Sequence, residues 1–205
     1  MSLSSTSSNT ASTRSETGDK RQLRQQLRSR RRLLSAAYQR RAAARLAQFA
    51  VGLPWFIRAR RIAFYLAADG EIDPHGLVEL ALRAGKQVFL PRLRSGRLEF
   101  AGYRPGAPMR NNRFRIPEPI GRAALAPQAL DAICLPLVGF DRRGGRLGMG
   151  GGFYDRTLAR AAGGAKPLLI GLAHSFQELD AVPVDPWDIP LKGVLTERGW
   201  IAARR

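Results

Sequence analysis

Residues 141–156 read Asp-Arg-Arg-Gly-Gly-Arg-Leu-Gly-Met-Gly-Gly-Gly-Phe-Tyr-Asp-Arg, a glycine-rich turn between two regular elements. The apolar run at residues 131–140 predicts a buried strand before the turn. The spacing of Phe153, Leu158 and Ala162, with Asp155 in the first turn, predicts a helix after it. A strand, a glycine-rich turn and a helix aim backbone N–H groups at one point, which favours binding of an anion such as phosphate.

Two charged residues flank the turn and extend this prediction. Arg146 can neutralise phosphate oxygens, and Asp155 can hold a Mg²⁺ that bridges them. The pattern is not a Walker A loop, because no Lys follows the glycines, and Phe153 occupies the place of the third Gly of a dinucleotide fingerprint. A flexible loop without a ligand is the alternative interpretation.

The composition bounds the architecture and the compartment. The chain has 205 residues, of which 44% are apolar, which is enough for one domain with a proper core. Its single cysteine, Cys134, excludes a disulfide framework and is expected to be a small buried residue. No apolar run approaches the roughly 18–20 residues that a membrane span requires. We therefore expect a cytoplasmic protein with no membrane partner.

The N-terminal region has two parts of different character. Residues 1–18 are rich in Ser and Thr and poor in large apolar side chains, so we expect a disordered tail before a single domain at residues 19–205. From residue 20 to residue 49 the apolar positions recur at steps of three, four and seven. This spacing predicts an amphipathic helix, or two with a break near Ser35, capped by Asp19.

The net charge of +18 calls for an anionic partner, and it is concentrated near this helix. Residues 20–68 contain no Asp or Glu. Most of the arginines are expected to form a solvated helix face. Lys20, Arg21 and Arg24 lie on the first helical turn, where they can fold over a bound polyphosphate.

A strand–helix–strand unit follows. Residues 61–67 and 86–91 predict strands, and between them a helix begins at Asp73-Pro74 and ends at Gly85. The short links imply a parallel, right-handed crossover, and parallel sheets bind ligands at the carboxyl ends of their strands. Leu66, Glu71 and Arg92 are therefore expected near the cleft. Further strands are predicted at residues 97–103 (an edge strand), 167–173, 194–197 and 200–201, with a covering loop at 104–130.

From about residue 20 to residue 200 the chain resembles the 5-formyltetrahydrofolate cyclo-ligase family, also called 5,10-methenyltetrahydrofolate synthetases. The most specific segment is the loop from Arg146 to Asp155. The other matching segments are Lys20-Arg-Gln-Leu-Arg24, Phe64-Tyr-Leu66, Glu71-Ile-Asp73, Leu90-Pro-Arg92, Gly139-Phe-Asp141, Val182-Pro-Val184, Trp187-Asp-Ile-Pro190 and Thr196-Glu197.

The resemblance implies a three-layer α/β/α fold with a mostly parallel sheet, related to ribose-phosphate isomerases and CoA-transferases. It implies conversion of 5-formyltetrahydrofolate to 5,10-methenyltetrahydrofolate, dependent on ATP and Mg²⁺, with ADP and phosphate released. Arg146 and Asp155 would be the catalytic residues, and Asp155 with Asp188 the metal ligands. The folate, with or without a polyglutamate tail, would lie near Leu66, Glu71 and Tyr154. The residues implied to bind ATP are Lys20, Arg21, Arg24, Arg146, Leu147, Gly148, Met149, Gly150, Gly151, Gly152, Phe153 and Tyr154.

The chain departs from the family pattern at two positions. Some members carry Lys where this loop has Gly151, so any phosphate contact there is through the backbone. An aromatic residue often follows the Pro-Arg of the second strand, and here that residue is Leu93. Ring stacking is therefore not expected at that point.

Other functions remain to be weighed. A nucleic-acid-binding protein would explain the charge of residues 20–61 but would leave the glycine loop, Asp155 and Asp188 without a purpose. A sugar-phosphate isomerase or a CoA-transferase would share the fold, since fold does not determine function. A degenerate relative would bind folate without turnover. We expect a monomeric enzyme, with nucleic acid not among its partners.

Overall fold

The computed structural model describes residues 9–121, 124–159, 167–185 and 188–204, with side chains from Lys20 onward. Its centre is an eight-stranded sheet in the order β12-β11-β10-β7-β1-β2-β3-β6. Strands β11, β10, β7, β1 and β2 run parallel, and β12, β3 and β6 pair antiparallel to their neighbours. The bounds are β1 (Arg61–Ala63), β2 (Gln87–Arg94), β3 (Arg97–Tyr103), β6 (Ala124–Leu125), β7 (Ala132–Pro136), β10 (Leu168–Leu172), β11 (Gly193–Thr196) and β12 (Gly199–Ala202).

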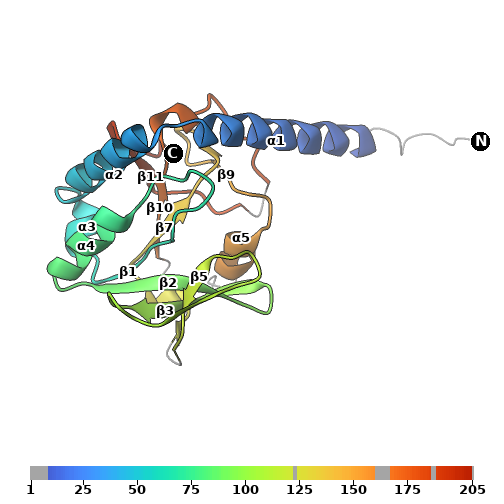
Figure 1. Ribbon diagram of the computed structural model, residues 1–205. Helices are drawn as coiled ribbons and strands as arrows, with labels where there is room; N and C mark the ends of the chain where they lie inside the picture. Colours follow the sequence, from blue (N-terminus) through green and yellow to red (C-terminus); the bar gives the residue numbers. More distant parts are fainter. Residues whose placement is uncertain (1–8, 122–123, 160–166, 186–187, 205) are drawn as a thin grey trace, which may run out of the picture.

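Helices lie on both faces of this sheet (Figure 1). One face carries α2 (Ala36–Ala50), α3 (Pro54–Arg58) and α4 (His75–Arg83), and the other carries α5 (Phe153–Leu158). Apolar side chains form a separate core cluster on each side of the sheet, because a buried parallel sheet must be covered on both faces. The predicted three-layer α/β/α fold is confirmed.

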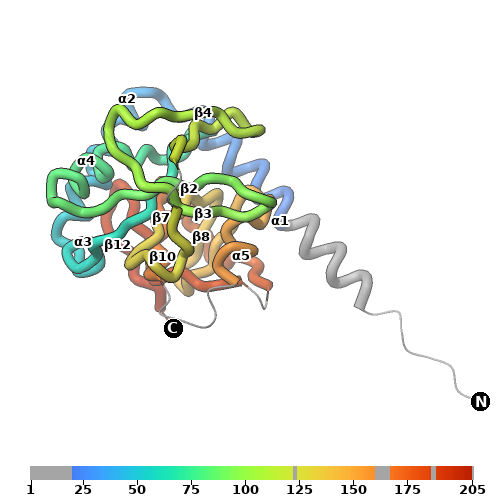
Figure 2. The backbone as a smooth tube through the Cα atoms, turned by 90° about the horizontal axis from the view of Figure 1, so that it is seen from below, coloured from blue at the N-terminus to red at the C-terminus, as the bar shows by residue number. Residues whose placement is uncertain are grey.

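Helix α1 (Asn9–Arg32) runs along one edge of the molecule, and its N-terminal end projects away from the body (Figure 1), whereas its part from Lys20 onward lies against the body (Figure 2). The predicted break near Ser35 is confirmed, since the Ser35 hydroxyl accepts a hydrogen bond from the Tyr38 N–H at 3.2 Å and caps α2. The predicted start is wrong, because Asp19 lies inside α1, not at its cap. Residues 9–18, which were expected to belong to the tail, have a helical backbone, and residues 1–8 lie outside the described residues.

Three expectations about the strands are corrected. Strand β1 ends at Ala63 instead of residue 67, because the chain leaves the sheet toward a turn in which Asp69 has φ 53°. Strand β3 is not at the edge, since β6 pairs with it. The expected loop contains a hairpin of β4 (Met109–Asn111) and β5 (Pro117–Pro119), whose turn is held by the Asn112 side chain accepting the N–H groups of Phe114 (2.8 Å) and Ile116 (3.1 Å).

The strand predicted at residues 131–140 is divided into two strands, β7 and β8 (Gly139–Phe140). Strand β8 pairs with β9 (Arg146–Leu147) in a second small hairpin, which was not predicted. Short 3₁₀ turns lie at η1 (Pro127–Ala129) and η3 (Ser175–Gln177). Cys134 is buried and unbridged in β7, as expected. In the described part of the chain, no helix has the length and apolar character needed to cross a membrane.

Candidate active site

The turn between β8 and β9 is organised by the buried carboxylate of Asp141. One of its oxygens, Oδ1, accepts the N–H groups of Arg143 (2.8 Å) and Gly145 (2.9 Å). The other, Oδ2, accepts the Val182 N–H at 2.8 Å. One side chain therefore fixes the start of β9 and ties it to the segment that leads to Asp185 and Asp188.

The glycine loop that follows β9 bends into α5. Gly150 has φ 90° and Gly152, the N-cap of α5, has φ 61°, a region that side chains with a Cβ rarely adopt. Arg24 donates from Nε to the Gly148 carbonyl at 2.9 Å, so α1 lies against the loop. The predicted helix start at Phe153 is confirmed, but the regular helix is short, and Ala162 lies outside the described residues.

The two residues expected to be catalytic form a direct pair. Arg146 donates from Nη2 to Asp155 Oδ1, and its Nη1 donates to the Ile189 carbonyl. The Arg146 side chain is 8% exposed, whereas Asp155 is 37% exposed. The cation is thus held from two sides, and the carboxylate keeps access to solvent and to a ligand.

Asp188 precedes Ile189, whose carbonyl contacts Arg146 of this pair. The carboxylate of Asp188 accepts the Asp185 N–H at 2.8 Å. Lys20 binds Asp185 Oδ2 at 2.7 Å, which joins the start of the cationic helix to the same segment. Trp187 lies outside the described residues.

These oxygen donors suit Mg²⁺ better than a softer metal. Mg²⁺ is usually held by one or two carboxylates together with substrate phosphates and water. Among the described residues, no group of three or more His, Cys, Asp or Glu side chains is placed to form a closed metal cage. Asp155 and Asp188 offer the sparse carboxylate set that fits a metal brought in with a nucleotide.

The cationic face of α1 lines a cavity of about 340 Å³. This cavity lies between α1 and the exposed tip of the glycine loop, and its lining includes two of the arginines predicted to bind phosphate. The lining residues are Arg21, Arg24, Gln25, Arg28, Ser29, Arg32 and Met149. The structure therefore brings together the two segments from which the sequence predicted a phosphate site, although they are more than a hundred residues apart.

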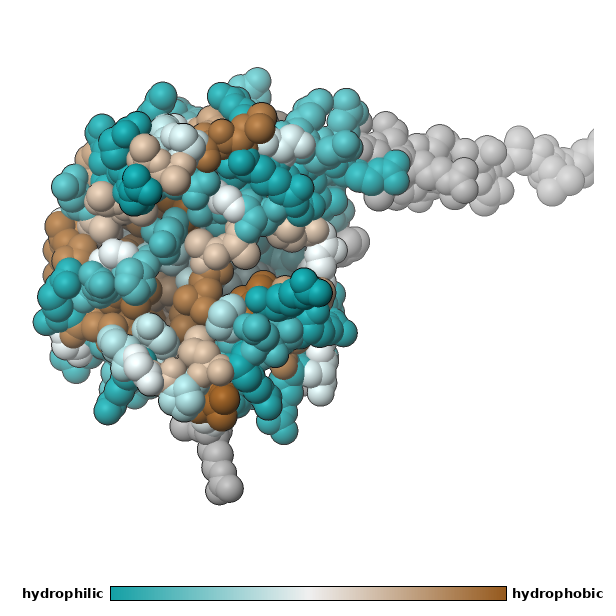
Figure 3. Space-filling view, in the orientation of Figure 1, coloured by the Kyte–Doolittle hydropathy of each residue, from teal (hydrophilic) through white to brown (hydrophobic). Residues whose placement is uncertain are grey.

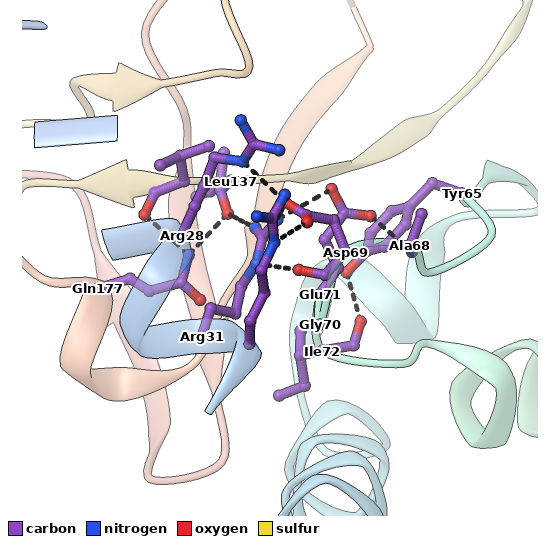
Figure 4. A network of polar contacts seen from close by, with 12 residues as sticks. Arg28, Arg31, Tyr65, Ala68, Asp69, Gly70, Glu71, Ile72, Leu137 and Gln177 are labelled. Carbon is purple, nitrogen blue, oxygen red and sulfur yellow. Dashed lines mark hydrogen bonds and ion pairs between the residues drawn. The ribbon is translucent and has the colours of Figure 1, made fainter. Parts of the chain in front are cut away.

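Arginines of α1 also bind the turn that carries Glu71 (Figure 4). Asp69 accepts hydrogen bonds from Arg28 and Arg32, and Arg31 donates to its carbonyl and to its carboxylate, each at 2.8 Å. Burial alone would raise the pKa of Asp69, but the hydrogen bonds from Arg28 and Arg32 outweigh it and lower the pKa to about 2. Asp69 is thus ionised and binds three arginines at once.

Glu71 lies next to this cluster and is largely buried, with 10% of its side chain exposed. Burial raises its pKa to about 6, against the opposing effects of a hydrogen bond from the Ala68 N–H and the charge of Arg31. Tyr154 is close enough that the charge of Glu71 adds to burial in raising the pKa of the tyrosine. Glu71 and Tyr154, both predicted to contact substrate, are thus close enough to interact electrostatically. Leu66 is half-buried and packs against the core cluster on the α2 and α4 side of the sheet, whereas Tyr154 packs against the other cluster.

The surface is hollowed on this side of the molecule (Figure 3). The hollow lies between the helical layer and the strands of the β2–β3 and β4–β5 hairpins, with hydrophilic and hydrophobic residues around it. The tip of the β4–β5 hairpin reaches the glycine loop, where the Phe114 ring meets the Phe153 ring edge-on at 5.7 Å.

Two predicted residues have other surroundings. Leu147 is buried against Leu27 and Val182, so only its backbone can face a nucleotide. Arg92 is tied to Glu99 and to the Gly121 carbonyl, and it lines a second cavity of about 470 Å³ on the β2–β3 hairpin. That cavity shares no lining residue with the one between α1 and the tip of the glycine loop.

The sequence interpretation missed Arg31, which it assigned to a solvated face. Its side chain is 1% exposed. The spacing of apolar residues could have predicted that Arg31 is buried. Residue 31 follows Leu27 by four positions and precedes Leu34 by three, which places it on the apolar side of the helix. The role of Asp141 was also missed, although its place before two glycines is typical of a turn-capping carboxylate.

Comparison with known proteins bears on this geometry. A model of the 5-formyltetrahydrofolate cyclo-ligase family matches residues 16–197. The chain is 41% identical over 175 residues to 5-formyltetrahydrofolate cyclo-ligase of Escherichia coli K12, covering 83% of the chain and 96% of that relative. It is 38% identical over 184 residues to the Haemophilus influenzae enzyme of the same name, covering 87% and 98%. The solution structure of Aquifex aeolicus 5,10-methenyltetrahydrofolate synthetase superimposes with a TM-score of 0.80 at 32% identity, covering 91% of this chain and 93% of that one.

Proposed function

The chain belongs to the 5-formyltetrahydrofolate cyclo-ligase family, and on that basis we propose that it is a ligase that converts 5-formyltetrahydrofolate to 5,10-methenyltetrahydrofolate. We further propose that ATP is the co-substrate, that Mg²⁺ is required, and that ADP and phosphate are released. The predictions of a monomer, of a cytoplasmic location and of activity on polyglutamylated folate belong to the same proposal.

One observation supports the ATP-dependent reaction above the others. Six residues of α1 and Met149 of the glycine loop line one cavity, and Arg24 also donates to the Gly148 carbonyl of the loop. A triphosphate needs many positive charges and backbone donors within a short distance. A nucleic-acid surface would instead present its cations outward. Here Arg24 and Arg28 are half-buried and directed at protein groups.

The chemistry requires activation of a poor electrophile. The formyl group on N5 is amide-like, so its oxygen must first become a leaving group. Attack of that oxygen on the γ-phosphorus of ATP forms an O–P bond and expels ADP. The substrate's own N10 then attacks the formyl carbon, the C–O bond to phosphate breaks, and the N10 proton is lost as the ring closes.

The protein's part in this sequence is positioning and charge neutralisation, because the nucleophiles belong to the substrates. In this proposal Arg146 neutralises charge on the transferring phosphoryl group, Lys20, Arg21 and Arg24 bind the remaining phosphates, and the backbone of residues 147–154 contacts the nucleotide. We assign Glu71 to the pterin N–H edge, since a carboxylate accepts paired N–H donors well, with Leu66 and Tyr154 beside the ring.

Asp155 and Asp188 would hold the metal. A bound Mg²⁺ would neutralise charge on the phosphate oxygens and fix their orientation. Asp155 has the more accessible carboxylate next to Arg146, and the Asp188 carboxylate is oriented by the Asp185 N–H. Arg146 is the ion-pair partner of Asp155 in the structure.

Replacing Asp155 by Asn tests this assignment. We expect the Mg²⁺ concentration for half-maximal activity to rise about tenfold or more, because an amide oxygen is a much weaker ligand than a carboxylate. The measurement is a Mg²⁺ titration of initial rates at saturating ATP. Asp180→Asn, which removes the same charge from an exposed position, is the matched control. An unaltered titration in Asp155→Asn would remove Asp155 from the metal site.

The overall proposal is tested by a spectrophotometric assay. The purified protein is mixed with 5-formyltetrahydrofolate, Mg²⁺ and ATP, and the near-ultraviolet absorbance of the methenyl product is followed. We expect the band to grow only when ATP is present, with ADP formed in equal amount. Folded protein that binds ATP but forms no product would contradict the proposal. Formation of product without ATP would exclude ATP as the co-substrate.

A further inference from the structure

Arg31 is a charged residue in a position that normally belongs to the core. It lies on the apolar side of α1 and is 1% exposed, although a buried guanidinium is costly unless its N–H groups are bonded. Its Nε donates to the Asp69 carbonyl (2.8 Å), Nη2 to Asp69 Oδ2 (2.8 Å) and Nη1 to the Leu137 carbonyl (3.1 Å). One side chain therefore joins α1 to the turn after β1 and to the segment after β7 (Figure 4).

The turn at residues 69–71 is shaped to receive this contact. Asp69 and Gly70 both have positive φ, 53° and 75°, and a Cβ on Gly70 would lie 2.9 Å from the Arg31 carbonyl oxygen. The Leu137 carbonyl is fixed in turn by Gln177, whose Nε2 donates to it at 2.6 Å. The guanidinium is thus held rigidly from several sides.

The same guanidinium faces Glu71. Nη2 lies 4.0 Å from Glu71 Oε1, and the other carboxylate oxygen, Oε2, accepts the Ala68 N–H at 3.1 Å. At this distance the contact is electrostatic, and in a buried setting it is weakly screened. Arg31 is therefore placed to stabilise the ionised form of Glu71. Because it does not hydrogen-bond to Oε1, that oxygen stays free to accept a hydrogen bond from a ligand.

We propose that Arg31 is a positioning residue for the substrate, which fixes the Asp69–Glu71 turn and keeps the Glu71 carboxylate charged for the pterin N–H edge. This inference rests on the proposed function, because it takes Glu71 to be the folate contact. Arg31 itself does not touch the reacting atoms. It connects the nucleotide-binding helix to the folate side of the site.

The surroundings of Glu71 determine the sign of each expected change. Burial raises its pKa to about 6, Arg31 and Arg28 oppose the rise, and Asp69 adds to it. Loss of Arg31 should therefore raise the pKa of Glu71, and loss of the Asp69 charge should lower it. The titratable and charged groups around Glu71 are Arg28 and Arg31 on α1, Asp69 in its own turn, Tyr65 after β1, Tyr154 on α5 and His174, whose Nε2 lies 3.2 Å from the Gly70 carbonyl oxygen.

The test measures binding of 5-formyltetrahydrofolate without ATP, by intrinsic fluorescence, on both sides of pH 6. In the wild-type protein the affinity should fall as pH drops below about 6, and Glu71→Gln should abolish this dependence. In Arg31→Gln the fall should begin about one pH unit higher. In Asp69→Asn, which keeps a residue tolerant of positive φ, it should begin at lower pH. Arg31→Lys should keep the wild-type profile with weaker binding.

Arg30→Gln is the matched control, because Arg30 is exposed on the same helix turn and packs over Phe176. It should leave the profile unchanged. A purely structural role would weaken binding in Arg31→Gln and Asp69→Asn alike, without opposite shifts, and that result overturns the inference. If a thermal melt shows that Arg31→Gln is not folded, the Asp69→Asn variant decides the question. The inference is refuted if the pH at which its folate affinity falls equals that of the wild type or lies higher. Wild-type protein that binds no folate would overturn the proposed function and this inference together.

Discussion

Replacing Arg146 by alanine is expected to lower kcat/KM for ATP by about 10²–10³-fold, through a lower kcat as well as a higher KM. Arg146 is in direct contact with Asp155, and it is also anchored by the Ile189 carbonyl. Its loss removes charge neutralisation where negative charge moves in the transition state. It also leaves Asp155 without its counter-ion.

Steady-state kinetics with the methenyl absorbance as readout would measure this effect. Arg142→Ala is the control, because Arg142 is exposed in the preceding turn and pairs with Glu178. Binding of 5-formyltetrahydrofolate alone should be preserved in Arg146→Ala, which separates a local loss from unfolding. Kinetics indistinguishable from the wild type would refute the assigned role.

Two truncations of α1 should differ completely in their effect. Removing residues 1–18 should leave the activity within about twofold of wild type, since exposed terminal segments tolerate deletion. Removing residues 1–24 should abolish ATP use, because it deletes Lys20, Arg21 and Arg24. Lys20 binds Asp185, and Arg24 binds the Gly148 carbonyl, so the deletion also removes the contacts that tie α1 to the Asp185 segment and to the glycine loop. Isothermal titration with a non-hydrolysable ATP analogue would measure the loss directly.

A full-length Lys20→Ala/Arg24→Ala variant separates loss of the cations from loss of the helical turns. It should bind the analogue as poorly as the longer deletion. Leu27 and Arg31, which attach α1 to the body, remain in both proteins. If the two truncations behaved alike, the basic start of α1 would have no part in the nucleotide site.

The spacing of apolar residues and the residues typical of helix caps and turns were sufficient to predict most of the secondary structure. Alternation between short apolar runs and helical spacing predicted the parallel strand–helix–strand unit, and the resemblance to the family implied the helices on both faces of the sheet. Ser35 was identified as a helix break and caps α2, and Gly85 was identified as a helix end and follows α4 with φ 70°. These features are local, because each depends on residues within about one turn of the chain. The glycine loop could be predicted for the same reason.

Only the tertiary structure determined which charges belong together. No spacing rule relates Arg24 to Gly148 or Arg31 to Asp69, since these contacts join distant segments and depend on how α1 lies across the sheet. The run of basic residues at 30–32 is uniform in sequence, yet Arg30 is exposed, Arg31 is buried and Arg32 is exposed but bound to Asp69. A guanidinium can leave water only where carbonyls and carboxylates from other segments replace its hydration. The sequence by itself therefore determined the parallel unit, most element boundaries and the glycine-rich turn. Packing decided the ionisation of Glu71 and the use of Arg31, because both depend on burial and on neighbours that the chain brings together only when folded.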